Sequence, residues 1–88
     1  MKVILSGTLL RFVGYEREIE VEARTVGEAI NAVEARHDAL RNVLRDGSGA
    51  VRTTHQLFVN GEQVGRNGLE RPVGRADVLE VLTAIAGG

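Results

Sequence analysis

Three stretches of the chain have the hydrophobic pattern of β-strands. In residues 2–10, Val3, Leu5 and Leu9 share one side, and in residues 77–82 Leu79 and Val81 do so. Residues 16–23 alternate most regularly, with glutamates at every second position. A period of two residues is typical of strands that bury one face. The sequence therefore predicts strands over residues 2–10, 16–23 and 77–82, the second with a solvated acidic face.

A helix is predicted between the second strand and the middle of the chain. Thr25-Val26-Gly27-Glu28 forms a capping box, in which Thr25 and Glu28 satisfy free amide groups at a helix start. Apolar residues then recur at helical spacing, so we expect a helix over residues 26–37 and a short helical turn near residues 39–45. His37 falls in the last turn and is interpreted as a helix-end residue rather than a ligand.

A hairpin is predicted after the helix. Residues 56–59 form a strand, Asn60-Gly61 suits a type I′ turn, and residues 62–64 return briefly. The order of the main elements is then β-β-α-β-β, with short extra segments such as the brief return over residues 62–64, and one helix covers one face of a mixed sheet. The simplest solution is an α+β fold of the β-grasp type, with the last strand beside the first in the middle of the sheet. Residues 1–82 would form this domain.

The opposite face of the sheet is less polar than a solvated face should be. Four apolar residues are expected there: Ile4, Phe58, Val78 and Leu82. An exposed apolar patch of this kind is often an interaction surface, so these residues are candidates for docking a partner. The alternative, that a loop around Leu69 covers part of the patch, stays open at this point.

Composition narrows the possible chemistry. The chain has 88 residues, 43% of them hydrophobic and 26% charged, with a net charge of −1 and no cysteine. This charge gives no reason to expect nucleic acid binding, and no apolar run is long enough to cross a membrane. Without a signal-peptide pattern, a cytoplasmic location is expected. The two histidines lie far apart, so neither a metal site nor a catalytic set is predicted, and the chain is not expected to be an enzyme.

The last six residues are expected to form a flexible arm outside the domain: Thr83, Ala84, Ile85, Ala86, Gly87 and Gly88. Two glycines at the end disfavour one fixed conformation and would let the backbone pass through a narrow channel. The chemical handle of such an arm is the carboxylate of Gly88, which is unreactive near neutral pH. A partner enzyme would have to activate it, for instance as an acyl-adenylate.

Residues 77–88 resemble the end of the ubiquitin-like sulfur carrier proteins. This family includes the small subunit of molybdopterin synthase, the thiamine-pathway carrier and the carrier serving cysteine synthesis. Weaker similarities are spread over the chain: Lys2-Val3, Leu9, Phe12, Gly14, Thr25-Val26-Gly27-Glu28 and Val59-Asn60-Gly61. Many members have proline where Thr83 stands and Asp-Gly-Asp at residues 75–77, which leaves the subfamily open.

The resemblance implies a mechanism. An adenylyltransferase of the ubiquitin-activating type, using ATP and magnesium held by that partner, would adenylate Gly88. A sulfur donor, either a sulfurtransferase or a desulfurase, would then leave a C-terminal thiocarboxylate, and residues 83–87 would carry it into a sulfur-accepting synthase. The chain itself would bind no cofactor and no metal. The acceptor stays open among a molybdopterin precursor, an activated serine, a thiazole precursor, tRNA and a secondary metabolite.

Two further functions use the same features. A ubiquitin-like modifier would join Gly88 to a lysine of a target protein. A non-catalytic interaction subunit would use the sheet face and leave the tail idle.

Overall fold

The structure is a computed structural model that describes residues 1–52 and 54–83, and only the backbone of residues 66 and 67. Its elements are the strands β1 (Lys2–Leu5), β2 (Glu18–Glu20), β3 (His55–Val59), β4 (Glu62–Val64) and β5 (Val78–Thr83), the α-helices α1 (Val26–Arg36) and α2 (Asp38–Leu44), and the 3₁₀ helices η1 (Gly7–Val13) and η2 (Arg66–Glu70). Within the described residues, no helix has the length and apolar character needed to cross a membrane.

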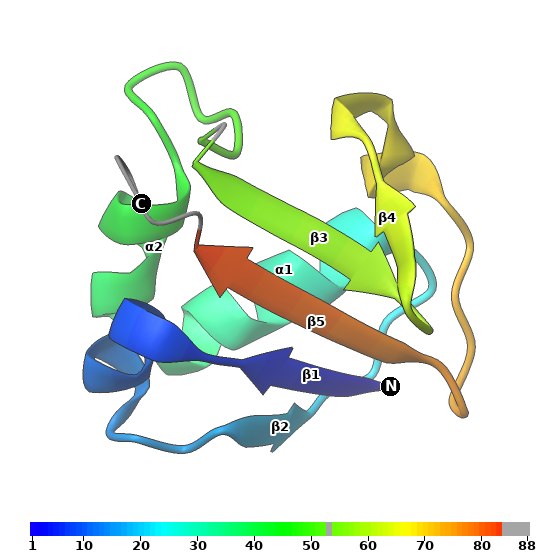
Figure 1. Ribbon diagram of the computed structural model, residues 1–88, viewed down its shortest axis with the longest axis horizontal. Helices are drawn as coiled ribbons and strands as arrows, with labels where there is room; N and C mark the ends of the chain where they lie inside the picture. Colours follow the sequence, from blue (N-terminus) through cyan, green and yellow to red (C-terminus); the bar gives the residue numbers. More distant parts are fainter. Residues whose placement is uncertain (53, 84–88) are drawn as a thin grey trace.

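The strands form one mixed sheet in the order β2-β1-β5-β3-β4. β1 and β5 pair in parallel, and the other neighbours pair antiparallel. The helix α1 lies behind the sheet in Figure 1, and the opposite face of the sheet is turned to the viewer. The predicted α+β, β-grasp fold is therefore confirmed, including the central position of the last strand beside the first.

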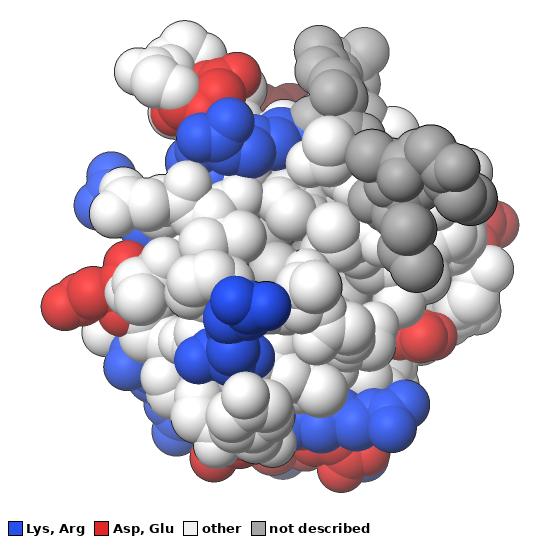
Figure 2. All heavy atoms as spheres, turned by 60° about the vertical axis from the view of Figure 1, so that its left-hand side comes forward, with Lys and Arg blue, Asp and Glu red and all other residues white. Residues whose placement is uncertain are grey.

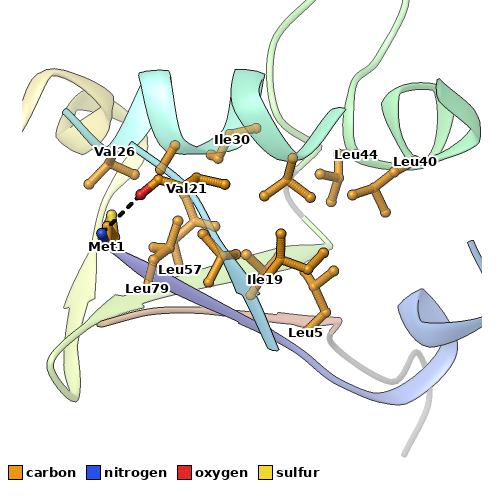
Figure 3. Packing of buried hydrophobic residues seen from close by; sticks show 14 of the residues in the cluster. Met1, Leu5, Ile19, Val21, Val26, Ile30, Leu40, Leu44, Leu57 and Leu79 are labelled. Carbon is orange, nitrogen blue, oxygen red and sulfur yellow. Dashed lines mark hydrogen bonds between the residues drawn. The ribbon is translucent and has the colours of Figure 1, made fainter. Parts of the chain in front are cut away.

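The core lies between α1 and the sheet. Leu79 and Val81 of β5 are buried against it, as their alternation predicts. Figure 3 shows side chains from the helices and strands meeting in this layer. At one end of the layer the Met1 amino group donates a hydrogen bond to the carbonyl oxygen of Val21 at 2.9 Å, which ties the start of β1 to the chain after β2.

The predicted strand over residues 2–10 is too long. β1 ends at Leu5, because Gly7 adopts a φ of +63° that an extended strand does not allow, and η1 follows. Leu9 is buried all the same, from the 3₁₀ helix rather than from a strand. The prediction was misled because one buried leucine fits either conformation.

The second predicted strand is also shorter than expected. β2 covers Glu18–Glu20, although Ile19 and Val21 are buried and the glutamates around them are exposed. Arg17, which the alternation places on the same side as Ile19, is exposed. Its carbonyl oxygen accepts a hydrogen bond from the Leu5 amide at 2.9 Å, so the backbone there continues beside β1 without strand geometry.

The helix and hairpin predictions are confirmed. The Thr25 hydroxyl accepts from the Glu28 amide at 3.1 Å, and the Glu28 carboxylate accepts from the Arg24 amide at 3.1 Å. His37 lies between α1 and α2, at the end of the first helix. Asn60 and Gly61 both have positive φ, at 51° and 84°, as a type I′ turn requires.

Candidate functional site

The four residues predicted to dock a partner lie together on the sheet face away from α1. The parallel pairing sets Ile4 of β1 beside Glu80 of β5, and the antiparallel pairing sets Phe58 of β3 on the other side of Glu80. Val78 and Leu82 lie two residues before and after Glu80 on the same face of β5. Ile4, Phe58, Val78 and Leu82 therefore surround one carboxylate, and we call these four residues the outer apolar patch.

The outer apolar patch is partly open to solvent. All four side chains are half-buried, and Figure 1 shows no described helix or loop over this face. Leu69 does not cover it, because Leu69 packs against the core on the helix side of the sheet. There its carbonyl oxygen lies only 3.2 Å from the position that a Cβ on Gly27 of α1 would take. The alternative of a covering loop around Leu69 is therefore wrong.

Glu80 was not among the predicted site residues. It is half-buried at the centre of the outer apolar patch, and none of the ion pairs among the described residues includes it. The strand alternation places it on the outer face, but only the pairing register shows that two other strands set apolar side chains on both sides of it. If a partner protein covered this face, the Glu80 carboxylate would lose its contact with water and would need a basic or hydrogen-bonding group opposite it.

Thr83, predicted as the first residue of the arm, belongs to the sheet. Thr83 is the last residue of β5 and pairs with His55, the first residue of β3. Assigning Thr83 to the arm is therefore corrected, because the ladder between β3 and β5 holds it in the sheet. Ala84, Ile85, Ala86, Gly87 and Gly88 lie outside the described residues.

His55 connects the base of the arm to α2. It is 9% exposed, its Nε2 lies 2.8 Å from the Val43 carbonyl oxygen, and its Nδ1 lies 3.3 Å from the Thr83 hydroxyl. The sequence analysis gave His55 no role. Its partners are 12 and 28 residues away, so no local pattern could have indicated them.

The opposite end of β5 is held by a network of polar groups. The Asp77 carboxylate accepts from the Asn60 side-chain amide at 2.9 Å and from the Gly74 backbone amide at 2.7 Å. The Asn60 side-chain oxygen accepts from the Val78 amide at 3.0 Å. The hydrogen bond from Asn60, followed by that from Gly74, lowers the pKa of Asp77 from its usual value. This end of the strand is structural and carries no reactive group.

A pocket of about 300 Å³ lies beside the first residues of β3. Apolar side chains from β3, β4 and η2 form much of its wall, and Arg52, His55 and Gln56 border it.

Within the described residues, no group of three or more histidine, aspartate or glutamate side chains could hold a metal ion. Figure 2 shows the left-hand side of Figure 1 brought forward, where uncharged residues predominate and Lys and Arg form small separate groups.

Comparison with known proteins agrees with this geometry. The family model of the ThiS family matches residues 3–88. A chain of the BexX/CysO complex of Amycolatopsis orientalis is 32% identical, with 99% of this chain and 98% of that chain covered and a TM-score of 0.84. No curated protein sequence matches the chain.

Two further solved structures share the fold. SAMP1 of Haloferax volcanii is 24% identical, with 100% and 98% of the two chains covered and a TM-score of 0.84. CysO of Mycobacterium tuberculosis is also 24% identical, with 96% and 98% covered and a TM-score of 0.81.

The sheet order and the similar solved structures define a ubiquitin-like β-grasp protein. The chain belongs to the ThiS family, which confirms the resemblance to ubiquitin-like sulfur carriers. Members of this family are small carrier proteins on which partner enzymes act, so the chain is a carrier and not an enzyme.

Proposed function

We propose that this protein carries sulfur as a thiocarboxylate on Gly88. The observation that supports this most directly is the family match, which runs from residue 3 through Gly87 and Gly88. The fold adds a reason of its own: β5 is the central strand, and the chain continues from it toward Gly88. A rigid strand can therefore present the arm to a second protein.

The proposed chemistry has two steps. An adenylyltransferase of the ubiquitin-activating type, holding ATP and magnesium, joins the Gly88 carboxylate to AMP and releases pyrophosphate. Hydrosulfide supplied by a sulfurtransferase or desulfurase then attacks the acyl carbon, and the C–O bond to AMP breaks. The products are a thiocarboxylate and AMP, and a synthase takes the sulfur in cofactor, cysteine or metabolite biosynthesis. Because the first step consumes ATP, we place it in the cytoplasm.

The outer apolar patch is the proposed docking face for these partners. Ile4, Phe58 and Leu82 supply apolar area that is only half-buried in the free protein. Glu80 in its centre requires a basic partner group once the interface excludes water, because an unpaired buried carboxylate is costly. We therefore expect the partner to present an apolar surface with an arginine or lysine opposite Glu80. The solved BexX/CysO complex of Amycolatopsis orientalis supports the general idea that such carriers bind partner proteins.

The first test is the intact mass of the protein after incubation with ATP, magnesium, a candidate adenylyltransferase and sulfide. The expected result is a gain equal to the exchange of one oxygen for one sulfur, located on the C-terminal peptide. A matched control is the variant that lacks Gly87 and Gly88, which keeps the described domain and should gain nothing.

Two outcomes would contradict the proposal. One is no gain in mass with an adenylyltransferase that loads another carrier in the same assay. The other is equal function in cells for the full chain and for the variant without Gly87 and Gly88, which would favour an interaction subunit instead.

A second candidate is a protein modifier. The fold is shared with a protein described as a small archaeal modifier of Haloferax volcanii, which is 23% identical to this chain. In this role the activated Gly88 would form an amide with a lysine of a target. Peptides bearing a Gly-Gly remnant on lysine, found in cells with the full chain and absent without Gly88, would favour this function.

A further inference from the structure

The β3–β5 ladder ends at the pair formed by His55 and Thr83. His55 lies opposite Thr83, but the His55 amide donates to the carbonyl oxygen of Arg52 at 3.1 Å. The His55 amide therefore points away from β5. His55 and Thr83 form a pair of the non-hydrogen-bonded kind, in which the side chains lie closer together. The contact that holds Thr83 against β3 at this position is the one between the two side chains, at 3.3 Å.

The ring of His55 is fixed from its other side. Its Nε2 lies 2.8 Å from the Val43 carbonyl oxygen, which can only accept, so Nε2 carries a hydrogen and donates it. In the neutral ring Nδ1 is then an acceptor, and the Thr83 hydroxyl donates to it. Thr83 is β-branched, so holding its hydroxyl also restricts the rotation of its side chain about the backbone.

We propose that His55 is a positioning residue for the C-terminal arm. Acting through the Thr83 hydroxyl, it sets the direction in which the chain leaves the sheet toward a partner's active site. The inference rests on the proposed function, since it assigns a role in loading Gly88. The His55 ring is itself anchored to α2, because its Nε2 contacts the carbonyl oxygen of Val43 in that helix.

Direction matters because Thr83 is the residue from which the chain continues toward Gly88. The reacting atoms must come within about 3–3.5 Å of each other in a partner's active site. Fixing Thr83 before binding reduces the orientational freedom that a partner must remove.

The test compares carriers as substrates of the adenylyltransferase. Thr83→Val removes the hydroxyl and keeps the branched shape, and we expect its KM to rise about three- to tenfold, the range of one neutral hydrogen bond, with kcat unchanged. Thr83→Ser keeps the hydroxyl and should restore the wild-type KM. His55→Gln should match Thr83→Val, and the double variant should lose no more than either single variant, because the two side chains act as one unit.

Two controls separate positioning from stability and from the proposed function. Thr54→Val makes the same chemical change at an exposed threonine next to His55 and should leave KM unchanged. The ¹⁵N order parameter of the Ala84 amide, measured on the free protein, should fall in Thr83→Val and recover in Thr83→Ser.

Three outcomes of these measurements decide between the two proposals. An Ala84 order parameter that is equal in wild type and Thr83→Val overturns the role of His55 whether or not any partner loads the chain. An unchanged KM for Thr83→Val, with active wild type, overturns it as well. A fall in the order parameter with a wild type that is never adenylated supports the role of His55 and contradicts the proposed function alone.

Discussion

The two ends of β5 are held in opposite ways. At its start, the side chains of Asn60 and Asp77 and the amides of Gly74 and Val78 form three hydrogen bonds of 2.7–3.0 Å. The Asn60 amide adds a backbone bond to the carbonyl oxygen of Val78 at 2.9 Å. The last pair at the other end has one side-chain contact, at 3.3 Å.

We infer from this difference that the start of β5 stabilises the fold and that the end of β5 presents the C-terminal residues to a partner. The start of β5 is fixed by side-chain hydrogen bonds to the Asn60-Gly61 turn in addition to its ladders. At the end of β5, the ladder to β3 is supplemented by one side-chain contact, between His55 and Thr83. Changes at the start should therefore alter stability, and changes at the end should alter activity.

The largest effect is expected beyond the end of the strand. Gly88→Ala should lower sulfur loading about tenfold to a hundredfold, because an added methyl group in a closely fitting channel is as costly as overpacking a core. The melting temperature should not change, which calorimetry can check together with the loading rate by mass spectrometry. Gly47→Ala is the matched control, since a Cβ there meets no atom within 4 Å. Equal loading of Gly88→Ala would contradict the idea of a narrow channel.

The next effect is expected at the start of the strand. Asn60→Ala should lower the free energy of unfolding by about 2–3 kcal/mol, because it removes two side-chain hydrogen bonds and places alanine at positive φ. Asn60→Gly loses the same hydrogen bonds but tolerates the backbone, so it should cost about 1 kcal/mol. Urea unfolding measures both. The loading rate per folded molecule should stay constant, and a loss of loading would show that the two ends of β5 are not independent.

A smaller effect is expected on the outer apolar patch. Leu82→Glu should raise the Kd for the adenylyltransferase about tenfold, because it places a charge beside Glu80 and removes apolar contact area. Phe58→Glu should act in the same direction. Ala35→Glu is the control, since Ala35 is exposed on α1, on the other side of the sheet, and an added charge there should leave the Kd unchanged. Titration calorimetry gives the Kd, and a large fall in melting temperature would instead mark Leu82 as part of the core.

The smallest effect is expected from Asp77 in acid. Its folded-state pKa is lowered by the bonds from Asn60 and Gly74, so its contribution is present above the unfolded value of 3.8 and is lost as pH falls through the folded pKa. Wild type should therefore lose more stability than Asp77→Asn when pH is lowered from about 5 to below 3. Unfolding curves at several pH values measure this slope, and equal slopes for the two proteins would exclude Asp77 as the cause.

The parts of the fold that local chemistry determines were predictable from sequence. The Asn60-Gly61 turn, the Thr25–Glu28 cap and the alternation around Leu79 each depend on a few consecutive residues, and each is present as predicted. The first strand was overextended because hydrophobic residues continue past Gly7, while the backbone turns there. Local patterns do not separate a strand from a 3₁₀ helix that buries the same leucine.

The site was predictable in part, for a different reason. The alternation placed Ile4, Phe58, Val78 and Leu82 on one face, and their role in docking stays a prediction. Neither Glu80 at their centre nor His55 at the base of the arm was found. Both depend on the pairing of strands that are far apart in the chain, and one sequence does not give that register.

The parallel pairing of β1 and β5 also determines how the molecule bears mechanical load. A partner that pulls on the arm pulls β5 along its own axis, and the ladders to β1 and β3 on its two sides are then sheared together instead of opening one bond at a time. Resistance to such a pull is a matter of unfolding rate rather than equilibrium stability. If loading and release of the carrier pull on its C-terminal end, we expect the domain to stay folded while the ladders of β5 resist the force.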